Sequence, residues 1–296
     1  MSQAGLKIAI LYDTWEDDAE EPAAPAEEVP PPRRAKRKRK SSKRARRPKL
    51  DREEIFDALG KLGHEPSYLV LDGRDQSLMA VARCNADLIF NLTESYAGDD
   101  TKDMNLAAYL ELLDQPFTGA GPHALYLAQD KSLAKKVFHF HKIRTPFFAV
   151  SYKGRLDHAH DIEFPLIVKP LSEDGSIGID ASSVVGSVKE LMEKIHYIHE
   201  QFDSPALIEE YIEGREIYAA VLGEEKAVAA YQALKLRDYG RIDMRLTDKG
   251  EIYVLEANPN PWLSSGAEFA MAARKSGRTY TDLMRDIVDL AMARYA

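Results

Sequence analysis

The chain has 296 residues, of which 45% are hydrophobic and 30% charged, and its formal net charge is -8. This composition is typical of a globular protein with more than one domain. No apolar run approaches the roughly 20 residues that a membrane-spanning helix needs. A single cysteine, Cys84, excludes an intrachain disulfide and a cysteine-based metal cluster, so we expect a reducing, cytoplasmic environment.

Strand and helix signals alternate through the first part of the chain, residues 1–120. The predicted strands are 7–12, 67–71 and 87–92, and the predicted helices are 51–62, 76–83 and 103–113. This alternation predicts a small parallel sheet with helices on both faces.

A charged low-complexity segment, residues 16–49, interrupts the first strand–helix connection. An acidic stretch leads through three prolines, Pro30 to Pro32, into a strongly basic stretch, 33–49. Blocks of like charge with few large apolar residues cannot bury enough surface to fold, which predicts a disordered insertion. Two interpretations stay open. The segment is either a basic arm, which contacts nucleic acid, an anionic membrane or an acidic partner or folds back on the acidic body, or a tolerated surface insertion.

The second part of the chain indicates one mostly antiparallel sheet. We expect a single helix at 124–141, extended chain at 143–148, strands at 164–170, 181–185, 206–212 and 217–222, a helix at 187–200, a hairpin at 241–256 and a final helix at 280–295. A loop of small residues, 171–179, follows the buried strand that carries Lys169 near its end. Exposed N–H groups in such a loop, beside a lysine, suit a phosphate, although an ordinary turn has the same pattern.

The predicted hairpin carries the most informative pattern. If residues 249–250 form its tip, Asp243 lies directly opposite Glu256. Opposed carboxylates repel each other unless a cation lies between them, and Mg²⁺ prefers oxygen ligands. Asn258 and Arg241 fall on the same face of the hairpin, which suits a divalent metal with phosphate. The alternative is a solvated hairpin edge with ordinary surface charges.

In their order and spacing these motifs resemble the ATP-grasp superfamily and, within it, the D-alanine–D-alanine ligases. The resemblance is clearest over residues 87–296, in the segments Phe90–Leu92, Pro116–Gly119, Asp130–Lys131, Val168–Pro170, Ser176–Gly178, Ile208–Glu216, Arg241–Asp243 and Glu256–Pro259. It implies an α/β plus α+β fold of the ATP-grasp type. The implied domains are a Rossmann-like pre-ATP-grasp domain at 1–120, a central lid subdomain at 121–208 and a metal-binding subdomain at 209–296.

The resemblance also implies the chemistry, which is ATP-driven ligation of a carboxylate to an amine through an acyl phosphate. The implied catalytic residues are Arg241, Lys169 and Ser176. The implied nucleotide-binding residues are Lys131 and Lys169 for the phosphates, Glu209, Glu210, Tyr211 and Ile212 for adenine, and Glu216 for ribose. The implied metal ligands are Asp243, Glu256 and Asn258, holding two Mg²⁺ ions or Mn²⁺ in their place. Residues 172–178 would form a lid over the acyl phosphate.

The substrate side departs from the family pattern. Residues 13–16 replace a loop with serine and glutamate, and only a short stretch separates Glu216 from Asp243. Trp262 stands where the family has a small residue, and Ala267 where it has a serine. We therefore expect a small carboxylate and an amine, both amino acids, in an altered pocket to which Glu94 and Ser95 contribute. The alternative is a non-catalytic nucleotide-binding regulatory or scaffold protein with a basic interaction arm. Whether the protein forms a homodimer stays open.

Overall fold

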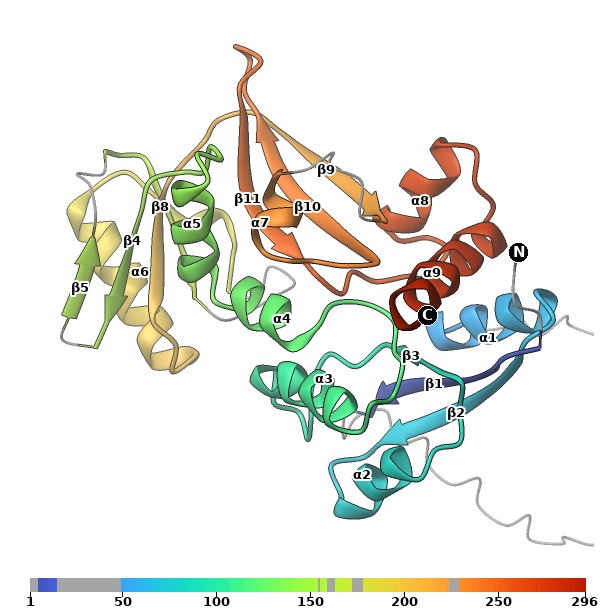
Figure 1. Cartoon of the computed structure of the whole chain (residues 1–296). Helices are drawn as coiled ribbons and strands as arrows, with labels where there is room; N and C mark the ends of the chain where they lie inside the picture. Colours follow the sequence, from blue (N-terminus) through green and yellow to red (C-terminus); the bar gives the residue numbers. More distant parts are fainter. Residues whose placement is uncertain (1–4, 15–48, 154, 159–162, 172–177, 224–228) are drawn as a thin grey trace, which may run out of the picture.

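The computed structural model describes residues 5–14, 49–153, 155–158, 163–171, 178–223 and 229–296, and its strands form three sheets (Figure 1). The predicted insertion, apart from Lys49, and the predicted lid residues 172–177, including Ser176, lie outside the described residues. No helix in the described ranges is both long and apolar enough to cross a membrane.

The N-terminal sheet is parallel, with the strand order β2-β1-β3. Its strands are β1 (Lys7–Asp13), β2 (Glu65–Leu71) and β3 (Leu88–Asn91), and the helices beside it are α1 (Asp51–Lys61), α2 (Asp75–Ala82) and α3 (Asp103–Leu112), with a 3-10 turn at Asp100–Lys102. The centre of β1, Ile8–Leu11, is apolar because both of its faces are covered. Ile8 and Ile10 pack with α1, whereas Ala9 and Leu11 pack with α2 and α3. The predicted parallel sheet with helices on both faces is confirmed, and its Rossmann-like character stays a prediction.

The last helix, α9 (Tyr280–Tyr295), completes the N-terminal layer rather than the C-terminal one. It contacts α1 across the face of β1 (Figure 1). The side chains that α9 buries there are Leu283, Met284, Ile287, Val288 and Ala291. The two ends of the described chain therefore share one hydrophobic core.

Two antiparallel sheets stand where a single one was predicted. The five-stranded sheet has the order β5-β4-β8-β6-β7, and the three-stranded sheet has the order β11-β10-β9. Their strands are β4 (Phe148–Tyr152), β5 (Arg155–His158), β6 (Leu166–Pro170), β7 (Val184–Val185), β8 (Ala206–Glu210), β9 (Arg215–Leu222), β10 (Tyr239–Leu246) and β11 (Ile252–Asn258). Helix α6 (Val188–Gln201) packs on the five-stranded sheet, after a 3-10 turn at Ala181–Ser183.

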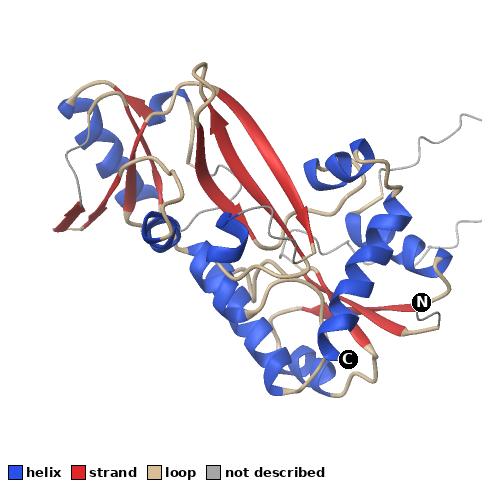
Figure 2. Cartoon of the chain, turned by 45° about the horizontal axis from the view of Figure 1, so that its top comes forward, coloured by secondary structure: helices blue, strands red, loops and turns tan. Residues whose placement is uncertain are grey.

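The chain leaves one sheet and enters the other at Gly214. Its φ is +155°, and a Cβ added there would lie 2.3 Å from the carbonyl oxygen of Leu246. Only glycine fits this close approach of two backbones. Figure 2 shows the five-stranded sheet beside the long strands of the three-stranded sheet, and in the part of the chain that the structure describes no strand belongs to both. The single-sheet prediction was wrong because strand periodicity does not tell which strands pair.

The predicted single helix at 124–141 is two helices, α4 (Pro122–Gln129) and α5 (Lys131–Phe140). Asp130 leaves the helical conformation, with ψ of 94°, and its carboxylate accepts hydrogen bonds from the N–H groups of Ser132 and Leu133. Aspartate is a preferred N-cap residue, so the break has a local cause that the apolar pattern conceals. Two short helices, α7 (Ala229–Ala233) and α8 (Glu268–Lys275), were not predicted.

A buried ion pair fastens α9 to the loop before β10. Arg294 donates to both carboxylate oxygens of Asp238 at 2.9 and 2.8 Å, and to the carbonyl oxygen of Phe117 at 2.7 Å. The side chain of Asp238 is only 2% exposed, and burial raises its pKa.

We expect Arg294→Met to lower the free energy of unfolding by about 3–5 kcal/mol, because it leaves a buried carboxylate without its partner. Urea denaturation measures this difference. Arg278→Met is the matched control, because its ion pair with Asp286 is exposed and should contribute less than about 1 kcal/mol. Equal effects of the two changes would contradict the role given to Arg294.

Candidate active site

The hairpin of β10 and β11 places the predicted metal ligands on one face. Asp243 pairs directly with Glu256, and Arg241 pairs with Asn258, which confirms the predicted pairing. The opposite face carries Ile242 and is part of the hydrophobic core. Alternation in the strands thus separates a polar face from an apolar one.

The reason given for this register was wrong. The tip is a three-residue loop, 248–250, rather than a two-residue one, because Leu246 pairs with Ile252 and the N–H of Thr247 donates to the carbonyl of Glu251 at 2.9 Å. Gly250, with φ of +80°, takes the left-handed position that such a loop needs. A β-bulge between Asp243 and Met244 then shifts the pairing by one residue. The bulge restores the Asp243–Glu256 pairing that the longer loop would have displaced.

Arg241 holds the carboxylate of Asp243 in a bidentate ion pair. Its Nε donates to Oδ1 at 2.7 Å and its Nη2 donates to Oδ2 at 2.9 Å. Arg241 also reaches Glu268 on α8 at 3.4 Å. Burial raises the pKa of Asp243, while Arg241 opposes that shift. A metal ion at Asp243 would therefore have to share this carboxylate with Arg241 or displace it.

Glu216 lies on the same polar face, one strand away. In the pairing of β9 with β10, Glu216 stands opposite Arg245 and Tyr218 opposite Asp243. Arg245 approaches the Glu216 carboxylate at 3.3 Å. The predicted ribose-binding residue and the predicted metal ligands thus share one surface.

A buried carboxylate with two lysines forms the other half of the site. Glu209 on β8 forms an ion pair with Lys135 on α5 and another with Lys169 on β6, the latter at 2.7 Å. Lys135 also donates to Oγ1 of Thr145 at 2.8 Å. Burial acts to raise the pKa of Glu209, but the two lysines outweigh it and lower the pKa to about 2. The carboxylate is therefore ionised at neutral pH.

Sequence reasoning missed Lys135. It lies one helical turn after Lys131, and both lysines are buried on the face of α5 that also buries Ala134 and Phe138. A lysine on the apolar face of an amphipathic helix is the signal that could have revealed it, because a buried ammonium group needs a partner.

The predicted adenine-binding segment is the edge where β8 ends. The N–H of Glu210 donates to the carbonyl of Phe147 at 3.0 Å, and the N–H of Tyr211 donates to the carbonyl of Pro165 at 3.1 Å. Ile212 is buried. The N–H groups of Glu210 and Tyr211 are thus engaged within the protein.

The predicted substrate-side residues Glu94 and Ser95 form hydrogen bonds with Trp262 and Asp13. Ser95 Oγ donates to Asp13 at 2.6 Å, and the indole Nε1 of Trp262 donates to Glu94 at 2.6 Å. Part of the Glu94 residue is exposed to solvent, but the protein around its carboxyl group removes enough water to raise the pKa of this group to about 7. The departures at the end of β1 and after β11 therefore contact the same loop, at Glu94 and Ser95.

A hydrogen-bonded asparagine connects this region to the hairpin. The N–H of Asn260 donates to Oδ1 of Asn258 at 3.1 Å, and its amide nitrogen donates to the carbonyl of Thr93 at 3.0 Å. Tyr239 donates to Oδ1 of Asn260 at 3.0 Å. The predicted metal ligand Asn258 and the loop with Glu94 are thereby held in register.

The predicted metal ligands fit a hard cation. Asp243, Glu256 and Asn258 offer only oxygen atoms, which suits Mg²⁺ or Mn²⁺. Among the described residues, no three His, Cys, Asp or Glu side chains cluster in a way that could hold a metal ion. The hairpin supplies two carboxylates and an amide instead, which is compatible with a metal that also takes phosphate oxygens.

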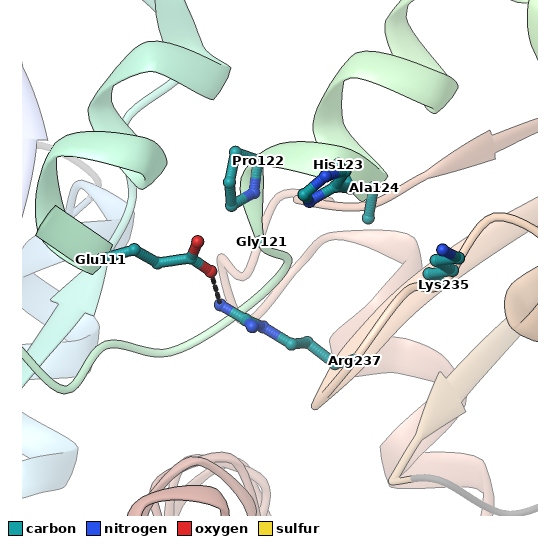
Figure 3. Close-up of a pocket in the computed structure, with 7 residues that line it drawn as sticks. All are labelled: Glu111, Gly121, Pro122, His123, Ala124, Lys235 and Arg237. Carbon is teal, nitrogen blue, oxygen red and sulfur yellow. Dashed lines mark hydrogen bonds and ion pairs between the residues drawn. The ribbon is translucent and has the colours of Figure 1, made fainter. Parts of the chain in front are cut away.

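A separate cavity of about 210 Å³ lies between α3, the start of α4 and the loop after α7 (Figure 3). Arg237 lines it and pairs with Glu111 at 3.3 Å. None of the predicted site residues lines this cavity.

Comparison with known proteins identifies the fold and then the family. The structure is similar to that of D-alanine–D-alanine ligase from Bacillus anthracis complexed with ATP, with a TM-score of 0.69, 20% identity and 98% coverage of each chain. The fold is therefore of the ATP-grasp class. The family model for the D-ala D-ala ligase C-terminus matches residues 137–230 and 224–289.

Two sequence relatives extend the match toward the N-terminus. A D-alanine–D-alanine ligase of Bordetella petrii is 30% identical over 76% of this chain and 82% of its own length. The uncharacterized protein y4sG of Sinorhizobium fredii is 28% identical over 82% of this chain and 88% of its own length. The chain belongs to the D-alanine–D-alanine ligase family, whose members are ATP-dependent ligases that use Mg²⁺.

The charge on Glu209 gives a testable dependence of stability on pH. Its pKa in the folded protein, about 2, lies below the ordinary 4.5, so its ion pairs stabilise the fold fully above about pH 4.5 and are lost as the pH falls toward 2. We expect the free energy of unfolding of the wild type, relative to Glu209→Gln, to fall by roughly 3 kcal/mol across this window. Urea titrations at several pH values measure it, and parallel pH profiles would refute the assignment.

Proposed function

We propose that the protein is an ATP- and Mg²⁺-dependent ligase that joins a carboxylate to an amine through an acyl phosphate. The observation that supports this most directly is the polar face of the β9–β11 sheet. It gathers Arg241, Asp243, Glu256 and Asn258 beside Glu216. Binding adenine alone requires none of these groups, whereas phosphoryl transfer requires a metal site and a cation beside it.

Each group has a role in the proposed reaction. Lys131 and Lys169 bind the nucleotide phosphates, the segment 209–212 binds adenine, and Glu216 binds ribose. Asp243, Glu256 and Asn258 would hold two Mg²⁺ ions, which neutralise phosphate charge when bound. Arg241, positioned by Asp243, stabilises the negative charge of the transferred phosphoryl group.

The substrates we propose are amino acids, bound in a pocket that differs from that of the D-alanine ligases. Glu94 and Trp262 form a hydrogen-bonded pair at the end of β3, where the family pattern has a small residue in place of the tryptophan. Asp13 adds a second carboxylate. This surrounding favours a substrate other than the D-alanine pair, with the amine end toward the acidic groups.

The three-domain division at 1–120, 121–208 and 209–296, the roles of Ser176 and the lid, the homodimer, the basic arm and the cytoplasmic location stay proposals. A nucleotide-binding regulatory protein is the second candidate. The bidentate hold of Arg241 on Asp243 favours it, because this ion pair competes with a metal ion.

We expect phosphate release from ATP and Mg²⁺ to depend on an amino acid within a panel of D- and L-amino acids and dipeptides, with a ligated product in the mass spectrum. Glu256→Gln should lower the rate by about 100-fold or more, because it removes a metal ligand.

Glu251→Gln is the matched control, since Glu251 is on the same hairpin, pairs with Arg144 and is half-exposed. Its rate should stay within about twofold of the wild type. ATP binding without phosphate release under any substrate would support the regulatory candidate. Equal loss of activity in both variants would contradict a specific role for Glu256 as a metal ligand.

A further inference from the structure

The cluster of Lys135, Glu209 and Lys169 places two ammonium groups against one buried carboxylate. The exposed fractions of the three side chains are 0%, 2% and 9%, respectively. A buried charge is tolerated when it is paired, and Glu209 is paired twice. One lysine would suffice to neutralise it. The second lysine therefore needs an explanation beyond charge balance.

The two lysines are held differently. Lys135 is completely buried, and its ammonium group is fixed by Thr145 as well as by Glu209. Lys169 comes from the end of β6, immediately before the predicted phosphate loop, and is the more accessible of the two. Burial lowers the pKa of Lys135, and the Glu209 carboxylate opposes that shift.

We propose that Lys135 is a positioning residue for the nucleotide: it keeps Glu209 neutralised while Lys169 exchanges this carboxylate for a phosphate of ATP. This inference rests on the proposed function, in which Lys169 binds phosphate. Without Lys135, the exchange would leave a buried, uncompensated carboxylate beside an incoming polyanion. With Lys135, the exchange leaves a neutral Lys135–Glu209 pair and a Lys169–phosphate pair.

The position of α5 suits this role. The helix contacts β4 of the five-stranded sheet and β11 of the hairpin. Lys131, one turn earlier on the same face, is proposed to bind phosphate. In this proposal Lys131 contacts the phosphates, whereas Lys135 contacts Glu209 in the sheet and does not contact the phosphates.

The test compares two ligands that differ in phosphate. We expect Lys135→Met to weaken ATP binding by at least about tenfold in calorimetry. Binding of adenosine, followed by NMR titration, should stay within about twofold, since adenosine draws no charge away from Glu209. Lys136→Met is the matched control, an exposed lysine on the same helix, and should leave both ligands unaffected.

A purely structural role for Lys135 would weaken both ligands in parallel, and that result, or an ATP affinity equal to that of Lys136→Met, overturns the proposal. A wild type that binds no ATP would instead refute the proposed function.

If Lys135→Met does not fold, a second pair of variants decides. Glu209→Gln removes the charge that Lys135 neutralises, so Lys135→Met added to Glu209→Gln should change ATP affinity by less than about threefold. A tenfold loss in this background would show that Lys135 acts on the nucleotide by another route, and the proposal would fail.

Discussion

The carboxylate of Glu209 is the constraint around which α5, β6 and β8 are arranged. A charge buried to this degree must be paired, and its partners come from a helix and from a neighbouring strand. The same two lysines therefore bind α5, β6 and β8 to one another. Because α5 also contacts β11, the helix that carries Lys135 connects the five-stranded sheet to the hairpin with the proposed metal ligands. The proposed phosphate side and metal side of the site are thereby connected through one helix.

Both halves of the site hold their charges in ready-made pairs. Arg241 occupies Asp243, and the lysines occupy Glu209. Ligand binding in such a site is an exchange of partners rather than the filling of a vacancy, so affinity depends on the difference between two sets of contacts. Preorganised groups of this kind lose little freedom when a ligand arrives, which favours catalysis by fixed dipoles and charges.

The sequence predicted the local patterns well and the long-range pairings poorly. The apolar strand β1, the final helix and the Asp243–Glu256 pair followed from periodicity, and the pair was right although its loop was three residues long and a bulge corrected it. Periodicity could not show that the antiparallel strands form two sheets, because pairing is a long-range choice. The break at Asp130 and the buried Lys135 were concealed within a helical pattern that accounts for apolar side chains only. The lid that was predicted at 172–178 stays a prediction, because residues 172–177 lie outside the described residues.

The shared core of β1 and α9 has a consequence for how the chain matures during synthesis. The face of the N-terminal sheet formed by Ile8 and Ile10 is covered by α1 and by side chains near the opposite end of the sequence. As the polypeptide emerges from the ribosome, α1 is available early, but both antiparallel sheets are translated before residues 280–295 can cover the rest of this face. The part of this face that α9 covers is thus among the last apolar surfaces to be enclosed, and the nascent protein exposes it for most of its synthesis.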